Sequence, residues 1–238
     1  MSIKAVLFDV GGPLDTEVRA EAMIDRSILE ACLEAGLRVT EADVTEASDW
    51  AVSVFAPDAY KAMIWRLCSG DPRRAEEIYA RAHDQWAFAR RREEAGLQLR
   101  DGMADALKSL HQAGFKLGLA ANQPAAVLLD LDRLGIGKYF EHRQVSGHHG
   151  FRKPDVRLFL AACEALHVRP AECVMVGDRI DNDIVPAKLL GMSTVLMRTG
   201  RHIDQQPRSA DEIPDFAITA TADGALHAIQ LCVMATGA

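Results

Sequence analysis

Short apolar runs that end in Gly, Pro or a polar residue recur along this chain, and they constrain its fold more than any other feature. The first run, residues 3–8, leads directly into Asp9 and then into Gly11-Gly12-Pro13. An apolar run closed at once by Gly and Pro predicts a buried strand that ends in a tight loop. Similar runs cover residues 115–121, 173–177, 194–197 and, more weakly, 216–218.

Helical patterns lie between these runs. Apolar residues from Val156 to Leu166 recur at the spacing of one helix face. Pro124 is suited to the first turn of a helix over 125–134, which Gly135 would end. Strands that alternate with helices predict a parallel sheet covered on both faces. The predicted fold class is therefore α/β, with a Rossmann-like three-layer core.

Residues 17–97 interrupt this alternation. The segment contains no convincing strand, and its apolar residues follow helical spacing. We therefore predict two domains: a core made of residues 1–16 and 98–238, and a smaller all-helical domain made of residues 17–97. The tryptophans, Trp50, Trp65 and Trp86, all lie in the helical segment. They are expected to form its own core, or alternatively to face a cleft and select an apolar substrate.

Composition narrows the possible partners and location. The net charge of −7 and the pI near 5.6 argue against a nucleic-acid binder, which usually carries a basic surface. The five cysteines include no CxxC pair, which favours free thiols in a reducing compartment. Residues 1–10 do not resemble a signal peptide, and no apolar run approaches the roughly 18 residues that cross a bilayer. We expect a cytoplasmic protein without membrane contact, either monomer or dimer.

Polar residues stand where the predicted strands end, and this is the main functional signal. Asp9 follows the first strand, Asn122 the second, and Asp178 the third, with Asp183 close behind. Ligands of open parallel sheets bind outside the carboxyl ends of the strands. The three carboxylates are hard oxygen ligands of the kind that Mg²⁺ takes. Lys153 lies in a loop that opens a helix, and its positive charge could neutralise an anion bound at the same edge of the sheet.

These motifs resemble those of the haloacid dehalogenase-like superfamily, in particular subfamily I with a helical C1-type cap. Asp9 matches the nucleophile, Lys153-Pro154 the lysine motif, and residues 177–183 the GDxxxxD metal motif. The resemblance implies a hydrolase, most simply an Mg²⁺-dependent phosphatase of small phosphate monoesters that passes through an aspartyl phosphate. It assigns Asp9 and Lys153 to catalysis, and a small phosphorylated anion as the substrate. It further implies substrate contacts from Gly12, Ala121 and Asn122, and metal contacts from Asp9, Gly11, Asp178 and Asp183.

Two departures from the family pattern leave the reaction open. Gly11 replaces the second Asp, which serves the family's phosphatases as general acid and base, and Ala121 replaces a hydroxyl residue. A slow phosphatase could take its proton from Asp15, Glu17 or the substrate. A binding or regulatory protein is the second explanation. The third is a different hydrolase: a dehalogenase, or a phosphonatase for which Lys61 is the candidate Schiff-base lysine.

Several polar residues near these motifs are expected to play no part in chemistry. Arg152 and Arg179 are expected on the surface, and His148-His149 in a loop. Asp181 is expected to be a loop or capping residue, and Asn182 to cap the helix that begins beside it.

Overall fold

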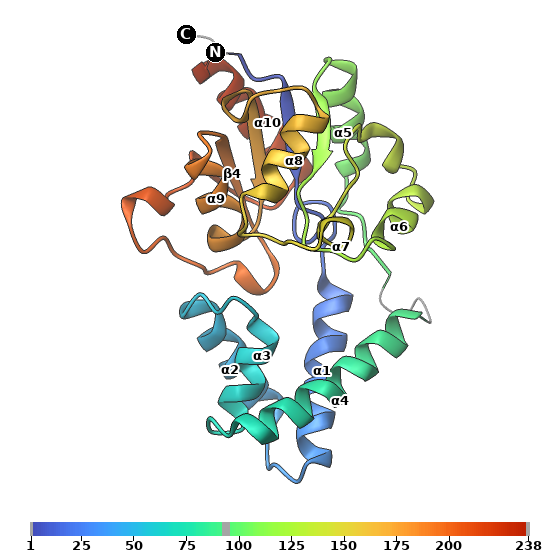
Figure 1. Ribbon diagram of the computed structural model, residues 1–238, viewed down its shortest axis with the longest axis vertical. Helices are drawn as coiled ribbons and strands as arrows, with labels where there is room; N and C mark the ends of the chain where they lie inside the picture. The colour runs from blue at the N-terminus through green and yellow to red at the C-terminus, as the bar shows by residue number, and fades with distance from the viewer. Residues whose placement is uncertain (1, 92–95, 237–238) are drawn as a thin grey trace. The chain divides into compact units, whose positions relative to one another are not determined.

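The computed structural model describes residues 2–91 and 96–236. The chain divides into two compact units, and Figure 1 shows the elements of each. The core unit consists of residues 1–16 and 97–238, and the helical unit consists of residues 17–96. The core unit has two clusters of buried apolar side chains, and the helical unit has one of its own.

The core unit is built on one five-stranded sheet in which every neighbouring pair of strands is parallel. The strand order is β2-β1-β3-β4-β5, which places β1 and β3 side by side in the middle. This confirms the predicted α/β class. The strands are β1 (Ala5–Phe8), β2 (Lys116–Leu119), β3 (Cys173–Gly177), β4 (Ser193–Arg198) and β5 (Phe216–Thr219).

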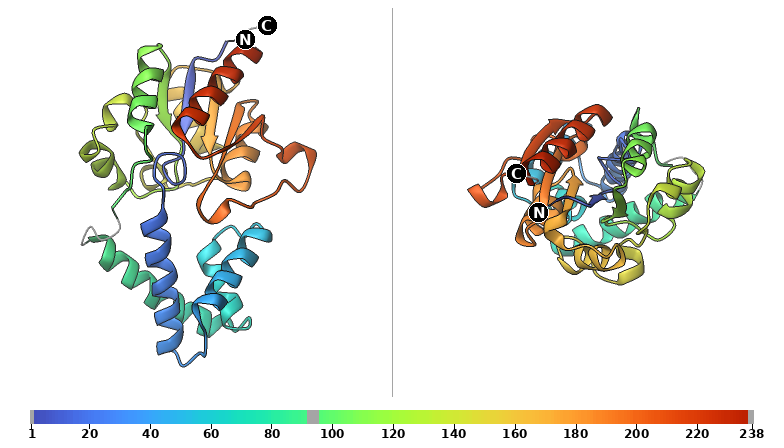
Figure 2. Two further views of the ribbon diagram at one scale, coloured as in Figure 1. Left: turned by 180° about the vertical axis from the view of Figure 1, so that it is seen from behind. Right: turned by 90° about the horizontal axis from the view of Figure 1, so that it is seen from above.

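Helices cover both faces of this sheet, which gives the three layers. Alternate side chains of β1 separate between the faces: Val6 and Phe8 join one hydrophobic cluster, and Ala5 and Leu7 join the other. Helix α8 lies in front of the sheet in Figure 1, and the reverse view in Figure 2 brings α10 to the front. The first face carries α5 (Met103–Gln112), α6 (Val127–Arg133) and α10 (Ala222–Thr236), and the second carries α8 (Arg157–Ala165) and α9 (Val185–Leu189).

Short helical turns connect these elements. The helix predicted over 125–134 is shorter in the structure: it covers Val127–Arg133, and Ala125 and Ala126 lie in the turn just before it. The turns are α7 (Ser146–His149), η1 (Gly137–Tyr139), η2 (Pro170–Glu172), η3 (Ile180–Ile184), η4 (Gly200–His202) and η5 (Ala210–Glu212).

No helix among the described residues combines the length and the apolar character needed to span a membrane.

The helical unit contains four helices in its described part. Thr40 is the N-cap of the second helix, Glu41–Ser53, and forms a capping box. Its side chain accepts the N–H of Asp43, and the side chain of Asp43 accepts the N–H of Thr40. The buried cluster is made of small and aliphatic side chains, with aromatic rings only at its margin. The helices are α1 (Val18–Glu34), α2 (Glu41–Ser53), α3 (Ala59–Leu67) and α4 (Pro72–Arg91).

Trp50 and Trp65 therefore do not fill the centre of this unit. Trp50 stacks on Trp65 with the ring centroids 6.3 Å apart. Trp50 packs partly buried against the cluster, whereas Trp65 remains 48% exposed. The side chain of Trp86 lies outside the described part of the chain.

Hydrogen bonds pair the two segments of the core unit that flank residues 17–96. The N–H of Thr16 donates to the carbonyl of Gln98 at 2.9 Å, and the N–H of Arg100 donates to the carbonyl of Leu14 at 2.8 Å. The N–H of Gln98 also donates to Oδ1 of Asp15 at 2.7 Å. The loop that follows β1 is thus joined to residues 98–100.

Candidate active site

Asp9 is the first residue after β1, and the sheet still governs its position. Its backbone N–H donates to the carbonyl of Val176 in β3 at 2.9 Å. Its Oδ1 accepts the N–H of Val10 at 2.7 Å, which fixes the carboxylate. The second oxygen, Oδ2, lies 2.6 Å from the ammonium nitrogen of Lys153. The central strand therefore presents one oriented carboxylate at its carboxyl end.

Lys153 bridges two carboxylates. Its Nζ lies 2.6 Å from Oδ2 of Asp9 and 2.6 Å from Oδ1 of Asp183. The lysine is only 3% exposed. A buried ammonium loses its hydration, so its stability in this position depends on those two partners.

Asn122 holds the lysine loop. Its Oδ1 accepts the backbone N–H of Lys153 at 2.7 Å, and its Nδ2 donates to the backbone carbonyl of Lys153 at 3.0 Å. Both ends of the amide are thus used within the protein, and the residue positions Lys153. The neighbouring Ala121 is fully buried, with its side chain in the hydrophobic core, and its carbonyl accepts the N–H of Ser146 at 3.0 Å.

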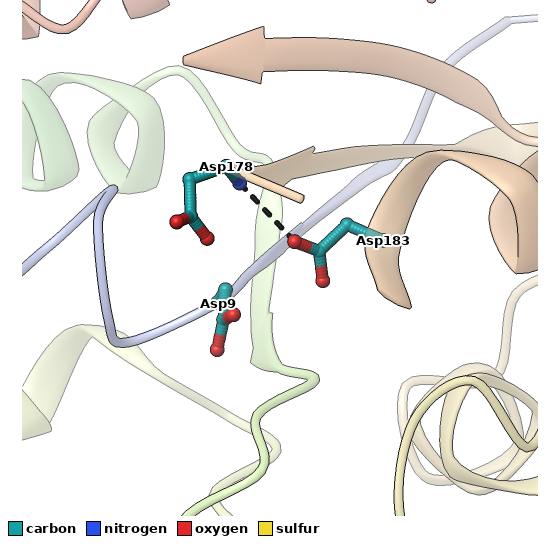
Figure 3. A group of neighbouring side chains, drawn as sticks. All are labelled: Asp9, Asp178 and Asp183. Carbon is teal, nitrogen blue, oxygen red and sulfur yellow. Dashed lines mark hydrogen bonds between the residues drawn. The ribbon is translucent and has the colours of Figure 1, made fainter. Parts of the chain in front are cut away.

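Asp178 and Asp183 come from the end of β3 and the turn after it. Asp183 lies in η3, a π-helical turn, and its Oδ2 accepts the N–H groups of Asp178 at 3.1 Å and Arg179 at 3.0 Å. Gly177 makes this turn possible, because a Cβ there would collide with the side chain of Asp183. Figure 3 shows the two carboxylates near that of Asp9.

The three aspartates form an acidic cluster suited to a cation. One oxygen from each of Asp9, Asp178 and Asp183 lies within 4.8 Å of the others. Three ionised carboxylates and the single ammonium of Lys153 would leave two excess negative charges in a largely buried site. A divalent cation with hard oxygen ligands would balance that excess. The residues present therefore fit a metal ion of this kind.

Electrostatics within the site favour an ionised lysine and a carboxylate that titrates near neutrality. Burial raises the pKa of Asp9 to about 6, Lys153 opposes the rise, and the charge of Asp183 adds to it. Burial also acts to lower the pKa of Lys153, but Asp183 and Asp9 outweigh it, so this pKa is raised. At pH 7 Asp9 is mainly ionised, which is the form that acts as a nucleophile or metal ligand.

The loop after Asp9 passes directly beside Asp178. Gly12 has a φ of +78°, and a Cβ on it would lie 2.6 Å from Cγ of Asp178. Only glycine fits this approach. The preceding Gly11 has no side chain with which to move a proton. Of the two suggested substitutes, Asp15 is buried and accepts the N–H of Gln98, and Glu17 belongs to the helical unit.

The positions of Arg179 and Asn182, two residues beside the site, differ from those expected from the sequence. Arg179 was expected on the surface, but its side chain is only 15% exposed because it pairs with Asp181 at 2.5 Å. Asp181 also accepts a hydrogen bond from Gln205 and does not belong to the acidic cluster. Asn182 is buried and makes no capping hydrogen bond to η3, so its predicted capping role is wrong.

His202 lies near the acidic cluster without having been predicted there. Its Nδ1 is 4.0 Å from Oδ2 of Asp178. Burial lowers the pKa of His202 to about 3, and Arg179 contributes to the decrease, so the imidazole is neutral at pH 7. The available signal was its position in η4, just after β4, because the carboxyl ends of parallel strands share one edge of the sheet.

The remaining candidates lie apart from this cluster. His148 and His149 end the short helix α7 rather than lying in a loop, and Nδ1 of His148 accepts the N–H of Val145. Arg152 is exposed, as expected. Lys61 lies in α3 of the helical unit, with its Nζ 4.8 Å from the centre of the Tyr79 ring.

A parallel sheet with an aspartate cluster and a buried lysine at its carboxyl edge defines a class: α/β enzymes that work on anionic substrates through carboxylates. Residues 3–191 match the haloacid dehalogenase-like hydrolase family. The chain belongs to this family and is a hydrolase, which confirms the resemblance drawn from its motifs. The subfamily and the cap type remain predictions.

Several proteins that are similar to this chain are named as phosphatases. A glyceraldehyde 3-phosphate phosphatase from Methanopyrus kandleri is 32% identical over 224 residues, which cover 91% of this chain and 93% of that protein. A phosphoglycolate phosphatase from Vibrio vulnificus is 38% identical over 115 residues, 47% of this chain and 48% of its own. The crystal structure of a phosphatase of this family from Thermococcus onnurineus shares the fold, with a TM-score of 0.61, 24% identity, and coverage of 95% of this chain and 98% of that one.

Proposed function

We propose that this protein is an Mg²⁺-dependent phosphatase of small phosphate monoesters, with Asp9 as the nucleophile. The observation that carries the proposal is the joint arrangement of Asp9, Lys153 and Asp183 beside Asp178. The relatives named as phosphatases of glyceraldehyde 3-phosphate and of phosphoglycolate support small phosphorylated compounds as the substrate class. These two compounds are the first substrates to test.

The proposed reaction has two steps at Asp9. In the first, a carboxylate oxygen of Asp9 attacks phosphorus, the bond from phosphorus to the leaving oxygen breaks, and an aspartyl phosphate forms. In the second, water attacks the same phosphorus, inorganic phosphate leaves, and the carboxylate is restored. Lys153 holds Asp9 in place and offsets part of the negative charge that the phosphate brings. Mg²⁺ held by Asp9, Asp178 and Asp183, with the backbone of Gly11, would supply further charge neutralisation.

Gly11 sets a limit on this chemistry. Without a carboxylic acid at this position, the leaving oxygen would take its proton from Asp15, Glu17 or a group of the substrate. Loss of a general acid typically slows such reactions by about 10²–10⁴-fold. We therefore expect a slow phosphatase rather than an inactive one, because the groups that bind and attack phosphate are retained.

A panel of phosphate esters with Mg²⁺ tests the proposal. The wild type should release phosphate, and Asp9→Asn should abolish release while leaving the protein folded. Asp130→Asn, which changes a carboxylate on α6 far from the cluster in the sequence, is the matched control and should retain activity. Release of phosphate by Asp9→Asn at the wild-type rate would contradict the role of Asp9.

The second candidate is a binding protein without turnover, which Gly11 and Ala121 favour. It predicts that the wild type binds Mg²⁺ and phosphate but hydrolyses no ester on the panel, whereas Gly11→Asp gains activity. Halide release from a haloacid without metal would instead support a dehalogenase. Formation of a reducible imine on Lys61 with a phosphonoaldehyde would support a phosphonatase.

The helical unit completes the proposed enzyme as its cap, the part that selects the substrate. Residues 17–97 are the proposed extent of this cap domain, and residues 1–16 and 98–238 form the catalytic core. The proposed location is the cytoplasm. All five cysteines are free and buried, which suits a reducing environment.

A further inference from the structure

The side chain of Arg100 joins the loop after Asp9 to two neighbouring strand ends. Its Nε and Nη2 both donate to the carbonyl of Gly12, at 3.1 and 2.5 Å. Its Nη1 donates to the carbonyl of Ala220, the residue after β5, and Nη2 also donates to Oγ1 of Thr199, the residue after β4. One planar guanidinium therefore binds three separate segments at the carboxyl edge of the sheet.

Gly12 is the point at which this loop meets the acidic cluster. Its Cα lies so near Asp178 that a Cβ would be 2.6 Å from the carboxylate carbon. The peptide after Gly12 leads to Pro13, which has no N–H with which to anchor the loop. The carbonyl of Gly12 is thus a principal attachment of the glycine segment, and Arg100 is the donor that holds it.

The backbone of Arg100 strengthens the same attachment. Its N–H donates to the carbonyl of Leu14 at 2.8 Å, two residues beyond Gly12. Arg100 therefore holds the loop at two places: its backbone N–H bonds Leu14, and its guanidinium bonds Gly12. Substitution of the side chain keeps the backbone bond and removes the bonds of the guanidinium to Gly12, Ala220 and Thr199, so the effect of the guanidinium can be measured apart from that of the backbone.

We infer that Arg100 is a positioning residue, which sets the distance between the Gly11-Gly12 backbone and Asp178 and so shapes the cation site and the phosphate-binding loop. This inference rests on the proposed function for its catalytic consequence, but not for its effect on cation binding. A residue that only stabilised the fold would alter the melting temperature and leave the affinity for Mg²⁺ unchanged.

Calorimetric titration with Mg²⁺ separates the two roles. Arg100→Ala should bind Mg²⁺ about 10- to 100-fold more weakly, the usual effect of removing a partner that orients metal ligands. Arg100→Lys keeps the positive charge but loses the planar guanidinium with its several donors. Its affinity for Mg²⁺ should therefore lie between that of Arg100→Ala and that of the wild type. Ethylguanidinium at millimolar concentration should restore part of the affinity of Arg100→Ala, because it can occupy the vacated space.

Arg133→Ala is the matched control, since Arg133 is exposed on α6, where its Nη1 lies 3.4 Å from Oδ1 of Asp130. It should keep the wild-type affinity and show no response to ethylguanidinium. Wild-type Mg²⁺ affinity in both Arg100→Ala and Arg100→Lys would overturn the inference, even if both melt at a lower temperature.

The catalytic consequence is measured separately, on whichever ester the wild type hydrolyses. Arg100→Ala should lower kcat at saturating Mg²⁺ more than it raises KM, because a displaced loop would no longer hold the phosphate in the right position for attack by Asp9. If the wild type hydrolyses no ester, the proposed function fails, while the Mg²⁺ titration still decides the role of Arg100. If the wild type is active and the variant matches it in kcat and in Mg²⁺ affinity, the inference alone fails.

Discussion

At the scale of single residues, the site depends on the balance of charge around Lys153. The ammonium is nearly inaccessible to solvent and touches a carboxylate on either side. Removing one member of a buried ion pair typically costs more than the pair contributes, because the remaining charge is left without a partner. Here two carboxylates would be left, and the third, Asp178, lies close by.

Lys153→Met should therefore lower the free energy of unfolding by about 3–5 kcal/mol in the absence of metal. Excess Mg²⁺ should restore part of the loss, since a cation in the acidic cluster replaces some of the missing positive charge. Urea denaturation with and without Mg²⁺ measures both effects. Lys108→Met, at an exposed position on α5, should change little, and an equally small change in Lys153→Met would contradict this account.

Gly11 leads to a prediction about leaving groups. A phenolate can depart without a proton, whereas an alkoxide cannot, so the wild-type kcat/KM should fall steeply as the pKa of the leaving alcohol rises. Gly11→Asp should flatten this dependence and raise hydrolysis of alkyl esters by about 10²–10⁴-fold. Gly11→Asn is the matched control, with similar size and no acid. A shallow dependence in the wild type would mean that another group already donates the proton.

The sequence predicts some residues of this site far better than others. Asp9 and Asp178 could be located because each directly follows an apolar run, and Lys153 and Asp183 because they stand at motif spacing. Arg100 could not, because its place depends on how loops fold back at the sheet edge, and His202 had only its position just after β4 as a signal. Asn122 was predicted to contact the substrate, and its bonds to Lys153 were not foreseen, because they depend on a contact between residues 31 positions apart.

At the scale of elements, the starts of the two central strands are joined by Glu172. Its carboxylate accepts hydrogen bonds from Lys4, just before β1, and from Arg169, just before η2, at 2.7 and 3.1 Å. The backbone N–H of Lys4 also donates to the carbonyl of Glu172 at 2.8 Å. The end of the sheet opposite the acidic cluster is therefore held by one carboxylate between two cations.

This arrangement makes stability depend on acid pH. Hydrogen bonds from Arg169 and then Lys4 lower the pKa of Glu172 to about 2, below its ordinary value of 4.5. A lowered folded-state pKa means that the stabilisation is complete above about pH 4.5 and is lost as the pH falls toward 2. The wild type should therefore exceed Glu172→Gln in unfolding free energy at pH 6, and the difference should shrink between pH 4.5 and 2.5.

Urea denaturation at several pH values gives the comparison. Glu164→Gln, on the exposed side of α8, should match the wild type throughout this range. A constant difference between wild type and Glu172→Gln from pH 6 to pH 2.5 would show that the carboxylate charge is not the cause.

Strands were easier to predict than the turns between them. The five apolar runs correspond to β1 through β5. The central strands β1 and β3 are buried throughout and are therefore apolar throughout, whereas β5, at the edge of the sheet, alternates between half-buried and exposed residues and gave the weakest signal. Helix α5 was missed, although Met103, Ala106, Leu107 and Leu110 give it a clear apolar face. The π-helical turn η3 had no sequence signal of its own, since it depends on Asp183 folding back to bond the N–H groups of residues 178 and 179.

At the scale of the whole molecule, the chain has separate hydrophobic cores for its two units. The four charged residues of the site, Asp9, Lys153, Asp178 and Asp183, all belong to the core unit. Ile28 belongs to the other core: it is fully buried among side chains of the helical unit. Cation binding should therefore be independent of packing in the helical unit, whereas substrate selection by the proposed cap should not.

Ile28→Ala should test this separation. It should destabilise the helical unit by about 2–5 kcal/mol, since it removes buried methyl groups and leaves a cavity. Hydrogen exchange should show the loss in residues 18–91, and the affinity for Mg²⁺ should stay at the wild-type value. Leu33→Ala, at a half-exposed position on the same helix, should change stability by no more than about 0.5 kcal/mol. Weaker Mg²⁺ binding in Ile28→Ala, of the size expected for Arg100→Ala, would instead show that the helical unit contributes to the cation site.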